Sequence, residues 1–467
     1  MDNRIFRLNP ECKLVISNNK GVLLLCKPYC NNPENNSEHY RISYITALII
    51  NNLDGRHTVN EVAQILGHLF NQKDKVDYLE SRVCAVICMF EKAFDALSTK
   101  DILVKRIYSD EYIIKTIAYY DKSEFKLQRL SFPRQIVMRI TNLCDKKCIY
   151  CYQCSYKNES DLEYLTMDRM SDILKEAAGN GTENLIVTGG EPFVRKDIYK
   201  IIEMASNQKL KVFVSTKRAL SQEQLQLLFF SGISELQFSV DTNNTQILQK
   251  LTGGNTDFSE YLSSIKMALK LNINVIVKAV ITSLNIKTIP LYVEELQQIG
   301  VKHIKLNYYE LNCKSNDFGL LPDISSMKWL DDNMKIICKR AQAKIEYDYD
   351  MAKMILDKKY RDLHRKRCLA FKDTIYIRED GKVSFCEMLM DYPEFIVGDL
   401  RTHTILDIWN SNEIDSYIVP DKTKFENTVC YTCHDFYTCF EKRCFMRTYA
   451  QYHKKFMPDP WCNKYEN

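Results

Sequence analysis

Three closely spaced cysteines are the residues of this chain whose type and spacing most clearly predict chemistry. They stand in Cys144-Asp-Lys-Lys-Cys148-Ile-Tyr-Cys151, a CxxxCxxC pattern that we call the cysteine loop (residues 144–151). Three thiolates this close can bind three irons of a [4Fe–4S] cubane and leave the fourth iron open to an outside ligand. An open coordination position suits a catalytic centre. The alternative is a structural zinc site, in which Cys154 completes a set of four thiolates.

A glycine pair ends the next predicted strand, in Thr188-Gly189-Gly190-Glu191-Pro192, which we call the glycine turn (residues 188–192). Glycine allows a positive φ and a close approach of the backbone to a ligand. Taken alone, the pair predicts an ordinary turn. Combined with the cysteine loop after the preceding strand, it resembles the radical S-adenosylmethionine (SAM) enzymes, because the two motifs agree in order, spacing and structural context.

This resemblance covers roughly residues 131–310 and implies a [4Fe–4S] cluster on Cys144, Cys148 and Cys151 with SAM at its open iron. The positions that match SAM contacts of the family lie at the ends of successive strands: Tyr150, Gly189, Gly190, Glu191, Ser215, Ser239, Asp241 and Lys278. The third strand departs from the family pattern, since Ser215-Thr216-Lys217 stands where many relatives have Thr-Asn-Gly.

The resemblance gives most of these positions a role, and some of them have a plainer interpretation. The glycine turn matches the segment that binds the SAM amino group, and Tyr150 matches an aromatic residue whose backbone reaches the adenine. Ser239 and Asp241 match ribose contacts, or they form a helix cap after a strand. Lys278 matches a basic residue that meets the SAM carboxylate, or it is a solvated lysine.

The elements that carry these residues are β-rich runs alternating with segments of helical length. Strands are expected over residues 135–141, 184–187, 211–215, 235–240, 274–281 and 303–307. Helices are expected between them, among others over residues 166–178, 220–230, 258–271 and 288–298. This alternation predicts parallel βαβ units, hence an α/β fold with a partial (β/α)6 barrel over residues 131–312. A Rossmann-type sheet is the alternative. The C-terminal ends of the strands, where the candidate residues lie, form the catalytic face of a barrel.

A cysteine-rich segment, residues 366–467, closes the chain with Cys368, Cys386, Cys430, Cys433, Cys439, Cys444 and Cys462. It has few long apolar runs, so bound metal is an expected source of its stability. A β-hairpin over residues 375–377 and 383–385, with Gly381 in its turn, would place Cys386 beside a metal site. Two structural zinc sites are one interpretation.

The same segment resembles the SPASM extension of radical SAM enzymes, which carries two auxiliary iron–sulfur clusters. The resemblance implies one auxiliary [4Fe–4S] cluster on a four-cysteine set (Cys430, Cys433, Cys439 and Cys462) and another on a three-cysteine set (Cys368, Cys386 and Cys444). The spacing between Cys439 and Cys444 is one residue longer than the family pattern. The three-cysteine set lacks one ligand, so either another residue completes it or one iron stays open to a substrate thiolate.

Residues 1–105 predict a winged-helix-like α+β module. A hairpin is expected over residues 13–17 and 22–26, followed by helices over residues 42–53, 62–70 and 73–96. A turn is expected at Asp54-Gly55, and a capping box at Thr58 and Glu61. The module resembles the PqqD-like elements of peptide maturases, in which a leader peptide adds a strand to the sheet. Residues 313–365 are expected to form a helical connector.

Composition and charge exclude several classes of protein. The chain has 64 basic and 60 acidic residues, and this balance gives no reason to expect nucleic acid or an anionic membrane as a partner. Neither a signal peptide nor a transmembrane segment is recognisable. The 18 cysteines therefore predict metal binding in a reducing cytoplasm rather than disulfides.

The resemblances together imply a radical SAM peptide maturase that binds a ribosomally made precursor through its leader and takes electrons from a flavodoxin or ferredoxin. A thioether crosslink in a cysteine-rich precursor is the preferred product, because an open auxiliary iron suits a thiol. The alternatives are a sulfatase-type formylglycine maturase and a zinc-stabilised peptide-binding protein without catalysis. The sequence names no catalytic acid or base.

Overall fold

The computed structural model describes most of the chain, in two units that are treated separately below, Met1–Ser131 and Phe132–Asn467. The described residues are 5–8, 12–17, 21–26, 38–42, 44–69, 76–89, 94–97, 130, 132–153, 163–315, 317–365, 368–418, 421–434, 436–440 and 442–462. Cys154 lies outside them. Among the described helices, none has the length and apolarity needed to cross a bilayer.

The described residues of the N-terminal unit form two three-stranded antiparallel sheets and three helices. One sheet has the order β2 (Cys12–Ser17), β3 (Gly21–Cys26) and β4 (Glu38–Ile42), so the expected hairpin is confirmed. The other has β1 (Ile5–Leu8) between β5 (Asp54–Thr58) and β6 (Phe94–Leu97). The helices are α1 (Tyr44–Asn52), α2 (Val59–Leu69) and α3 (Val76–Met89).

Two local predictions for this unit were wrong, both because of pairing with β1. The helix expected to reach residue 96 ends at Met89, since Phe94–Leu97 pairs with β1 as strand β6. Asp54 and Gly55 begin strand β5 rather than forming a turn. The capping box is confirmed, because the backbone N–H of Glu61 donates to Oγ1 of Thr58 at 3.2 Å and that of Thr58 donates to the Glu61 carboxylate at 2.8 Å. The winged-helix assignment stays a prediction.

The second unit is built on one ten-stranded sheet that contains all six predicted barrel strands. These are β7 (Gln135–Arg139), β8 (Asn184–Thr188), β9 (Lys211–Thr216), β10 (Glu235–Ser239), β11 (Val275–Ile281) and β12 (His303–Tyr308). They are parallel and lie side by side in chain order. A doubly wound sheet reverses its strand order at a switch point. The unbroken order therefore excludes the Rossmann alternative and fits a partial barrel.

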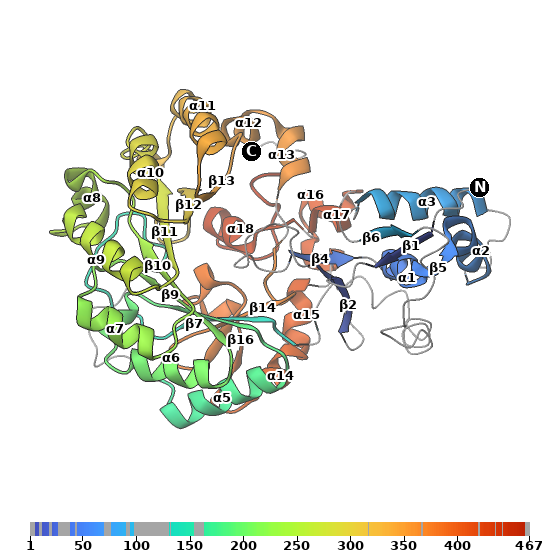
Figure 1. Ribbon diagram of the computed structural model, residues 1–467, viewed down its shortest axis with the longest axis horizontal. Coiled ribbons are helices and arrows are strands. Elements are labelled where there is room, and N and C mark those ends of the chain that lie inside the picture. The colour runs from blue at the N-terminus through green and yellow to red at the C-terminus, as the bar shows by residue number, and fades with distance from the viewer. Residues whose placement is uncertain are drawn as a thin grey trace. The chain divides into compact units, whose positions relative to one another are not determined.

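Helices cover the outer side of this curved sheet, as Figure 1 shows. They are α5 (Met167–Gly179), α6 (Ile198–Asn207), α7 (Gln222–Phe230), α8 (Thr245–Thr252), α9 (Phe258–Lys270), α10 (Ile289–Gln298) and α11 (Ile324–Arg340). The apolar side chains of the strands and of the inner helix faces are buried together, as Leu185, Ile201 and Ile265 illustrate with no exposed surface. The carboxyl ends of the parallel strands therefore meet at one edge.

The sheet continues beyond the predicted barrel at both edges. On one edge β13 (Lys344–Tyr347), within the expected helical connector, pairs in parallel with β12. On the other, β14 (Thr374–Ile377) pairs in parallel with β7, and β15 (Lys382–Ser384) and β16 (Ile396–Asp399) follow in antiparallel order. The predicted hairpin of the cysteine-rich segment is thus confirmed. It is also continuous with the barrel sheet, which fixes its position relative to β7.

Most of the rest of the unit consists of short helices, and some of them contribute to an aromatic core. The helices are α12 (Met351–Leu356), α13 (Lys358–His364), α14 (Ile405–Trp409), α15 (Asn412–Ile418), α16 (Val429–Thr432), α17 (Phe436–Phe440) and α18 (Phe445–Tyr452). Phe385 stacks on Tyr417 with ring centroids 4.4 Å apart and meets Phe445 edge-on at 5.1 Å. Buried rings of this kind stabilise a core in addition to any bound metal.

Candidate functional site

The cysteine loop follows β7, and hydrogen bonds to its backbone hold it from two directions. The N–H groups of Lys147 and Ile149 donate to the carbonyls of Thr252 and Leu251, at the end of α8, at 2.9 and 3.0 Å. From the segment after β12, the Ser315 hydroxyl donates to the Ile149 carbonyl at 2.9 Å. The loop is therefore positioned by the barrel before any ligand binds.

The three thiols of the loop are half-buried, and none is in a disulfide. Burial raises the pKa of Cys148 to about 12, with Lys217 opposing this shift and the neighbouring Cys144 and Cys151 adding to it. Thiols that influence one another in this way lie close together, and soft thiolate donors suit an iron–sulfur cluster. Among the described residues no three His, Cys, Asp or Glu side chains converge on one point that could hold a single metal ion. A cubane does not need such convergence, because each thiolate binds a different iron.

The glycine turn packs directly against the chain that enters the cysteine loop. The N–H groups of Gly190 and Glu191 donate to the carbonyls of Thr141 and Leu143 at 2.9 and 2.7 Å. A Cβ on Gly189 would lie only 2.8 Å from the Thr141 carbonyl oxygen, so a side chain at this position would push the two segments apart. The two sequence motifs thus form one continuous surface at the carboxyl ends of β7 and β8.

Glu191 uses its carboxylate to hold the end of β9. It accepts hydrogen bonds from the Thr216 hydroxyl and from the backbone N–H of Lys217, both at 2.8 Å, and its side chain is buried. Burial raises the pKa of Glu191, although these hydrogen bonds oppose the shift. The SAM contact predicted for Glu191 stays a prediction, and its observed contacts are within the protein.

Lys217 connects several of the predicted SAM-binding positions, and the sequence interpretation did not include it. Its ammonium group donates to the Tyr150 hydroxyl at 2.6 Å, to an oxygen of Asp241 at 2.9 Å and to the Ser239 carbonyl at 3.0 Å. The Tyr150 hydroxyl also donates to Asp241. The signal that could have found Lys217 is the departure of strand three from the family pattern.

The remaining predicted positions lie on neighbouring strands. The Gln237 amide donates to the hydroxyls of Ser215 and Ser239 at 3.1 and 3.3 Å, which brings these two predicted residues together. Lys278 is in register with Ser239 on β10 and with Lys305 on β12. Burial lowers the pKa of Lys278, while the negative charge of Glu387 opposes this shift. Lys278 therefore lies on the strand next to Ser239, and its role stays a prediction.

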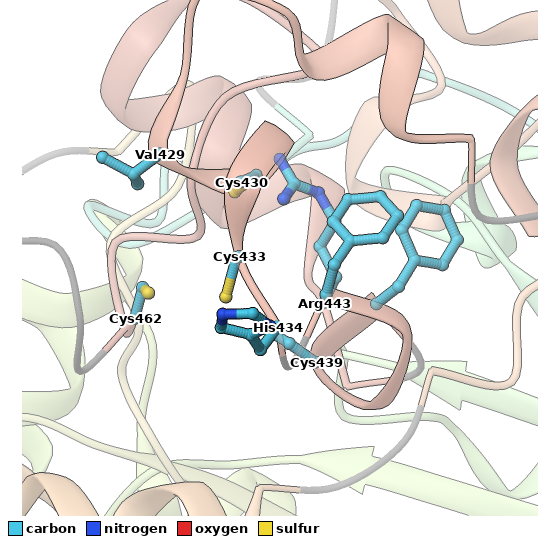
Figure 2. A pocket seen from close by; sticks show the side chains of 9 residues that line it. Val429, Cys430, Cys433, His434, Cys439, Arg443 and Cys462 are labelled. Carbon is cyan, nitrogen blue, oxygen red and sulfur yellow. The ribbon is translucent and has the colours of Figure 1, made fainter.

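The four-cysteine set lines one cavity of about 170 Å³, shown in Figure 2. Cys430, Cys433, Cys439 and Cys462 all contribute to its wall, together with the exposed His434. Burial raises the pKa values of Cys430 and Cys439, while the guanidinium groups of Arg443 and Arg365 oppose these shifts. Four thiols around one space, with cations beside them, fit the donor set of an iron–sulfur cluster.

The thiols of the three-cysteine set are half-buried and influence one another's pKa. Burial raises the pKa of Cys386 well above its usual range, and the charges of Cys368 and Cys444 add to the effect. Burial likewise raises the pKa of Cys444 to about 11. The Cys444 N–H donates to the buried carboxylate of Asp459 at 3.1 Å. The three cysteines come from the segment before β14, the segment after β15 and the N-cap position of α18.

Asp459 links the two auxiliary sets, and sequence reasoning missed it. Its carboxylate pairs with Arg447 at 3.0 Å and with Arg365 at 3.6 Å. Arg365 in turn donates to the Cys439 sulfur at 3.6 Å, and the Cys462 N–H donates to the Asp459 carbonyl at 2.7 Å. One buried carboxylate thus holds segments of both cysteine sets in place.

A second set of missed residues joins the cysteine loop to the cysteine-rich segment. The Tyr152 hydroxyl donates to Glu387 at 2.6 Å, and these residues directly follow Cys151 and Cys386. Thr188, which begins the glycine turn, donates to the same oxygen of Glu387 at 3.4 Å. Both motifs of the barrel therefore meet a side chain that adjoins the three-cysteine set.

The comparisons with known proteins match the two halves of this site separately. Residues 138–299 match the model of the radical SAM superfamily, and residues 368–434 match that of an iron–sulfur cluster-binding domain, SPASM. A probable GTP 3′,8-cyclase of Methanocaldococcus jannaschii is 28% identical over 169 residues, which are 36% of this chain and 56% of that protein. The chain spans about half the length of this relative and of the similar cyclases.

Two further proteins are similar over more of the chain. The PqqA peptide cyclase of Bradyrhizobium diazoefficiens is 23% identical over 300 residues, which are 63% of this chain and 77% of that protein. The crystal structure of SuiB from Streptococcus suis, bound to S-adenosylmethionine, superposes with a TM-score of 0.64 at 16% identity. The superposition covers 98% of this chain and 100% of SuiB, so the fold is shared.

The radical SAM domain implies a [4Fe–4S] cluster that binds SAM, and the SPASM domain implies auxiliary iron–sulfur clusters. The cysteine loop, the glycine turn and the two cysteine sets are the candidates for holding these groups, and their individual roles stay predictions. The chain therefore contains a radical SAM domain over residues 138–299, built as a partial β/α barrel, and a SPASM domain over residues 368–434.

Proposed function

We propose that this enzyme modifies a ribosomally made precursor peptide and that its product is a thioether crosslink. When bound, the first cluster and SAM supply a 5′-deoxyadenosyl radical that removes a hydrogen atom from the peptide. Cys144, Cys148 and Cys151 would hold that cluster, and the glycine turn would orient SAM beside it. Such enzymes tolerate oxygen poorly, which is our reason for proposing a cytoplasmic location.

The hydrogen bond between Tyr152 and Glu387 carries this proposal. At 2.6 Å it ties the residue after Cys151 to the residue after Cys386. A substrate held at the three-cysteine set would consequently lie close to the source of the radical. If no other residue completes the three-cysteine set, one iron of a cluster held there would be open to a thiolate, which favours a cysteine of the peptide as one partner of the new bond.

Glu387 is our candidate for the proton acceptor. Its carboxylate is half-buried, contacts Tyr152 and Thr188, and lies near the ammonium group of Lys278. A thioether bond between a thiol and a carbon takes two hydrogens from the peptide: the radical would remove one as a hydrogen atom, and the thiol would release the other as a proton. The remaining electron would pass to an auxiliary cluster, and a carboxylate within reach can accept the proton.

The similar proteins support a peptide substrate. One of them is named a PqqA peptide cyclase, and SuiB has been crystallised with its precursor peptide SuiA. We infer that residues 1–105 bind the leader of the precursor by adding its backbone to a sheet edge, as PqqD-like modules do. An external flavodoxin or ferredoxin would supply the electron that starts each cycle.

Anaerobic co-expression with a small cysteine-containing peptide encoded beside the gene tests this function by mass spectrometry. We expect the peptide to lose two hydrogens for each crosslink. One fewer thiol of the peptide should then react with an alkylating agent. The purified enzyme should contain roughly twelve irons if three cubanes form. Replacing Cys144, Cys148 and Cys151 by alanine should abolish the mass change.

Cys338→Ala is the matched control, because Cys338 lies on α11, outside all three cysteine groups, and should leave modification intact. A loss of sulfur from the peptide would indicate formylglycine formation instead. Stoichiometric zinc without iron, or an unchanged peptide mass with an active electron donor, would contradict the proposed function.

A further inference from the structure

Lys217 occupies a buried position at the centre of the proposed SAM site. Its side chain is 16% exposed, and that of Asp241, its ion-pair partner at 2.9 Å, is 1% exposed. A lysine ammonium can donate three hydrogen bonds, and this one has three acceptors within 3.0 Å: the Tyr150 hydroxyl, the Asp241 carboxylate and the Ser239 carbonyl. The ammonium group is therefore fully used within the protein.

The backbone of Lys217 is held as firmly as its side chain. Its N–H donates to Glu191 at 2.8 Å, and its carbonyl accepts from the Tyr261 hydroxyl of α9 at 2.5 Å. Through one residue the end of β9 thus contacts the cysteine loop, the glycine turn and the end of β10. A network with this many satisfied partners restricts the orientation of each member.

Asp241 has little capacity left for a ligand. One of its oxygens accepts from the Val280 N–H at 3.0 Å, and the other accepts from both Lys217 and Tyr150. Its side chain is almost completely buried. A direct hydrogen bond to a ribose would have to displace one of these contacts and leave a buried partner unpaired, which costs free energy.

We propose that Lys217 is a positioning residue that fixes Tyr150, and with it the last turn of the cysteine loop, and that Asp241 is its counterion rather than a ribose contact. This inference rests on the proposed function in one respect, that the cysteine loop holds a cluster and binds SAM. Because Tyr150 lies between Cys148 and Cys151, a change in its position would shift both these cysteines and the backbone expected beside the adenine.

The charge of Lys217 has a second consequence for the same loop. A cation near an iron–sulfur cluster stabilises its more negative, reduced form, and burial reduces the screening of that charge. The Lys217 ammonium adjoins the residue between two of the three cluster cysteines. Removing the cation should therefore make the midpoint potential of the first cluster more negative, even when SAM is absent.

The test compares Lys217→Met, Lys217→Arg and Asp241→Asn in the full-length enzyme with all clusters assembled. The readouts are the midpoint potential of the SAM-free first cluster, from redox titration followed by electron paramagnetic resonance, and the dissociation constant for SAM. We expect Lys217→Met to lower the potential and weaken SAM binding. Lys217→Arg keeps the charge, so its midpoint potential should stay close to that of the wild type. Its SAM affinity should fall further from the wild-type value, because the guanidinium group has a different geometry from the ammonium group.

A double variant, Lys217→Met with Asp241→Asn, separates the counterion role from a ribose contact. If Asp241 only balances Lys217, the double variant should bind SAM no more weakly than Lys217→Met alone, since no buried charge is left unpaired. Lys305→Met is the control: its ammonium pairs with Glu346 at 3.8 Å, and it should leave the potential unchanged.

Independent, additive losses of SAM affinity with no change of potential in any Lys217 variant would overturn the inference and restore Asp241 as a ribose contact. If Lys217→Met assembles no cluster while the double variant does, the counterion role is supported by iron content alone. A wild-type enzyme that forms no cluster on the cysteine loop would instead refute the proposed function.

Discussion

At the scale of single residues, Glu387 combines three properties that a proton acceptor needs. It is half-buried, it lies beside a cysteine of the three-cysteine set, and its carboxylate receives hydrogen bonds from Tyr152 and Thr188. Glu387→Gln keeps the size and an acceptor oxygen but removes the charge. We expect peptide modification to fall roughly 10²–10⁴-fold, the usual contribution of a general base.

The measurement is the rate of peptide modification, beside iron content and SAM binding, both of which should stay at wild-type levels. Tyr152→Phe is the companion variant, because it removes the hydrogen bond and leaves the carboxylate in place. A smaller loss of rate in Tyr152→Phe than in Glu387→Gln supports the proton-acceptor role. Equal rates for Glu387→Gln and wild type would exclude that role.

The residues that sequence analysis could and could not identify differ in how far apart their partners lie in the chain. The cysteine loop and the glycine turn are recognisable because their functional residues are close together in sequence. Lys217, Glu387 and Asp459 acquire their importance from distant partners, as in the contact between Tyr152 and Glu387. Such a contact corresponds to no recognisable spacing in the sequence, so it can be identified only from the fold.

At the scale of elements, the end of α8 is part of the cysteine-loop site. Gly253 caps this helix with a φ of 66°, and a Cβ there would lie 2.6 Å from the Lys147 carbonyl oxygen. Gly253→Ala therefore adds backbone strain of about 1–2 kcal/mol and a clash with the loop. We expect less iron on the first cluster and weaker SAM binding.

The neighbouring glycine provides a matched control. A Cβ on Gly254 would meet no atom within 4 Å, so Gly254→Ala should keep wild-type iron content and SAM affinity. Iron analysis of a variant that lacks both auxiliary cysteine sets isolates the first cluster. Equal effects of the two glycine substitutions would show that the close approach to Lys147 is unimportant.

Sequence analysis missed several short strands, most of them at sheet edges. The barrel strands are recognisable because apolar runs alternate with segments of helical length, and their order follows from parallel βαβ connections. β6 and β13 have only four residues each, and each becomes a strand by pairing with a partner elsewhere in the fold. Their local sequences do not distinguish them from the adjacent helices.

At the scale of the second unit, barrel and SPASM domain share one sheet and one buried ion-pair cluster. Arg139 of β7, with no exposed surface, pairs with Glu379 at 2.6 Å and with Asp391 at 2.7 Å. Lys314, after β12, pairs with Asp391 at 2.5 Å and donates to the Gln153 carbonyl at 2.8 Å. The same charges thus join the strand before the cysteine loop, the segment after that loop and the SPASM domain.

Arg139→Met tests whether this cluster holds the two domains together. It removes the cation and leaves two buried carboxylates, a change that costs about 3–5 kcal/mol when one partner of a buried ion pair is lost. We expect a clear fall in the melting temperature measured by calorimetry on the cluster-loaded enzyme, and faster proteolysis between barrel and SPASM domain. Arg401→Met, which breaks exposed pairs with Asp399 and Glu163, should cost at most about 1 kcal/mol. If both variants have the melting temperature of the wild type, continuity of the sheet alone accounts for the junction. The buried charges are then not needed to keep the three-cysteine set beside the cysteine loop.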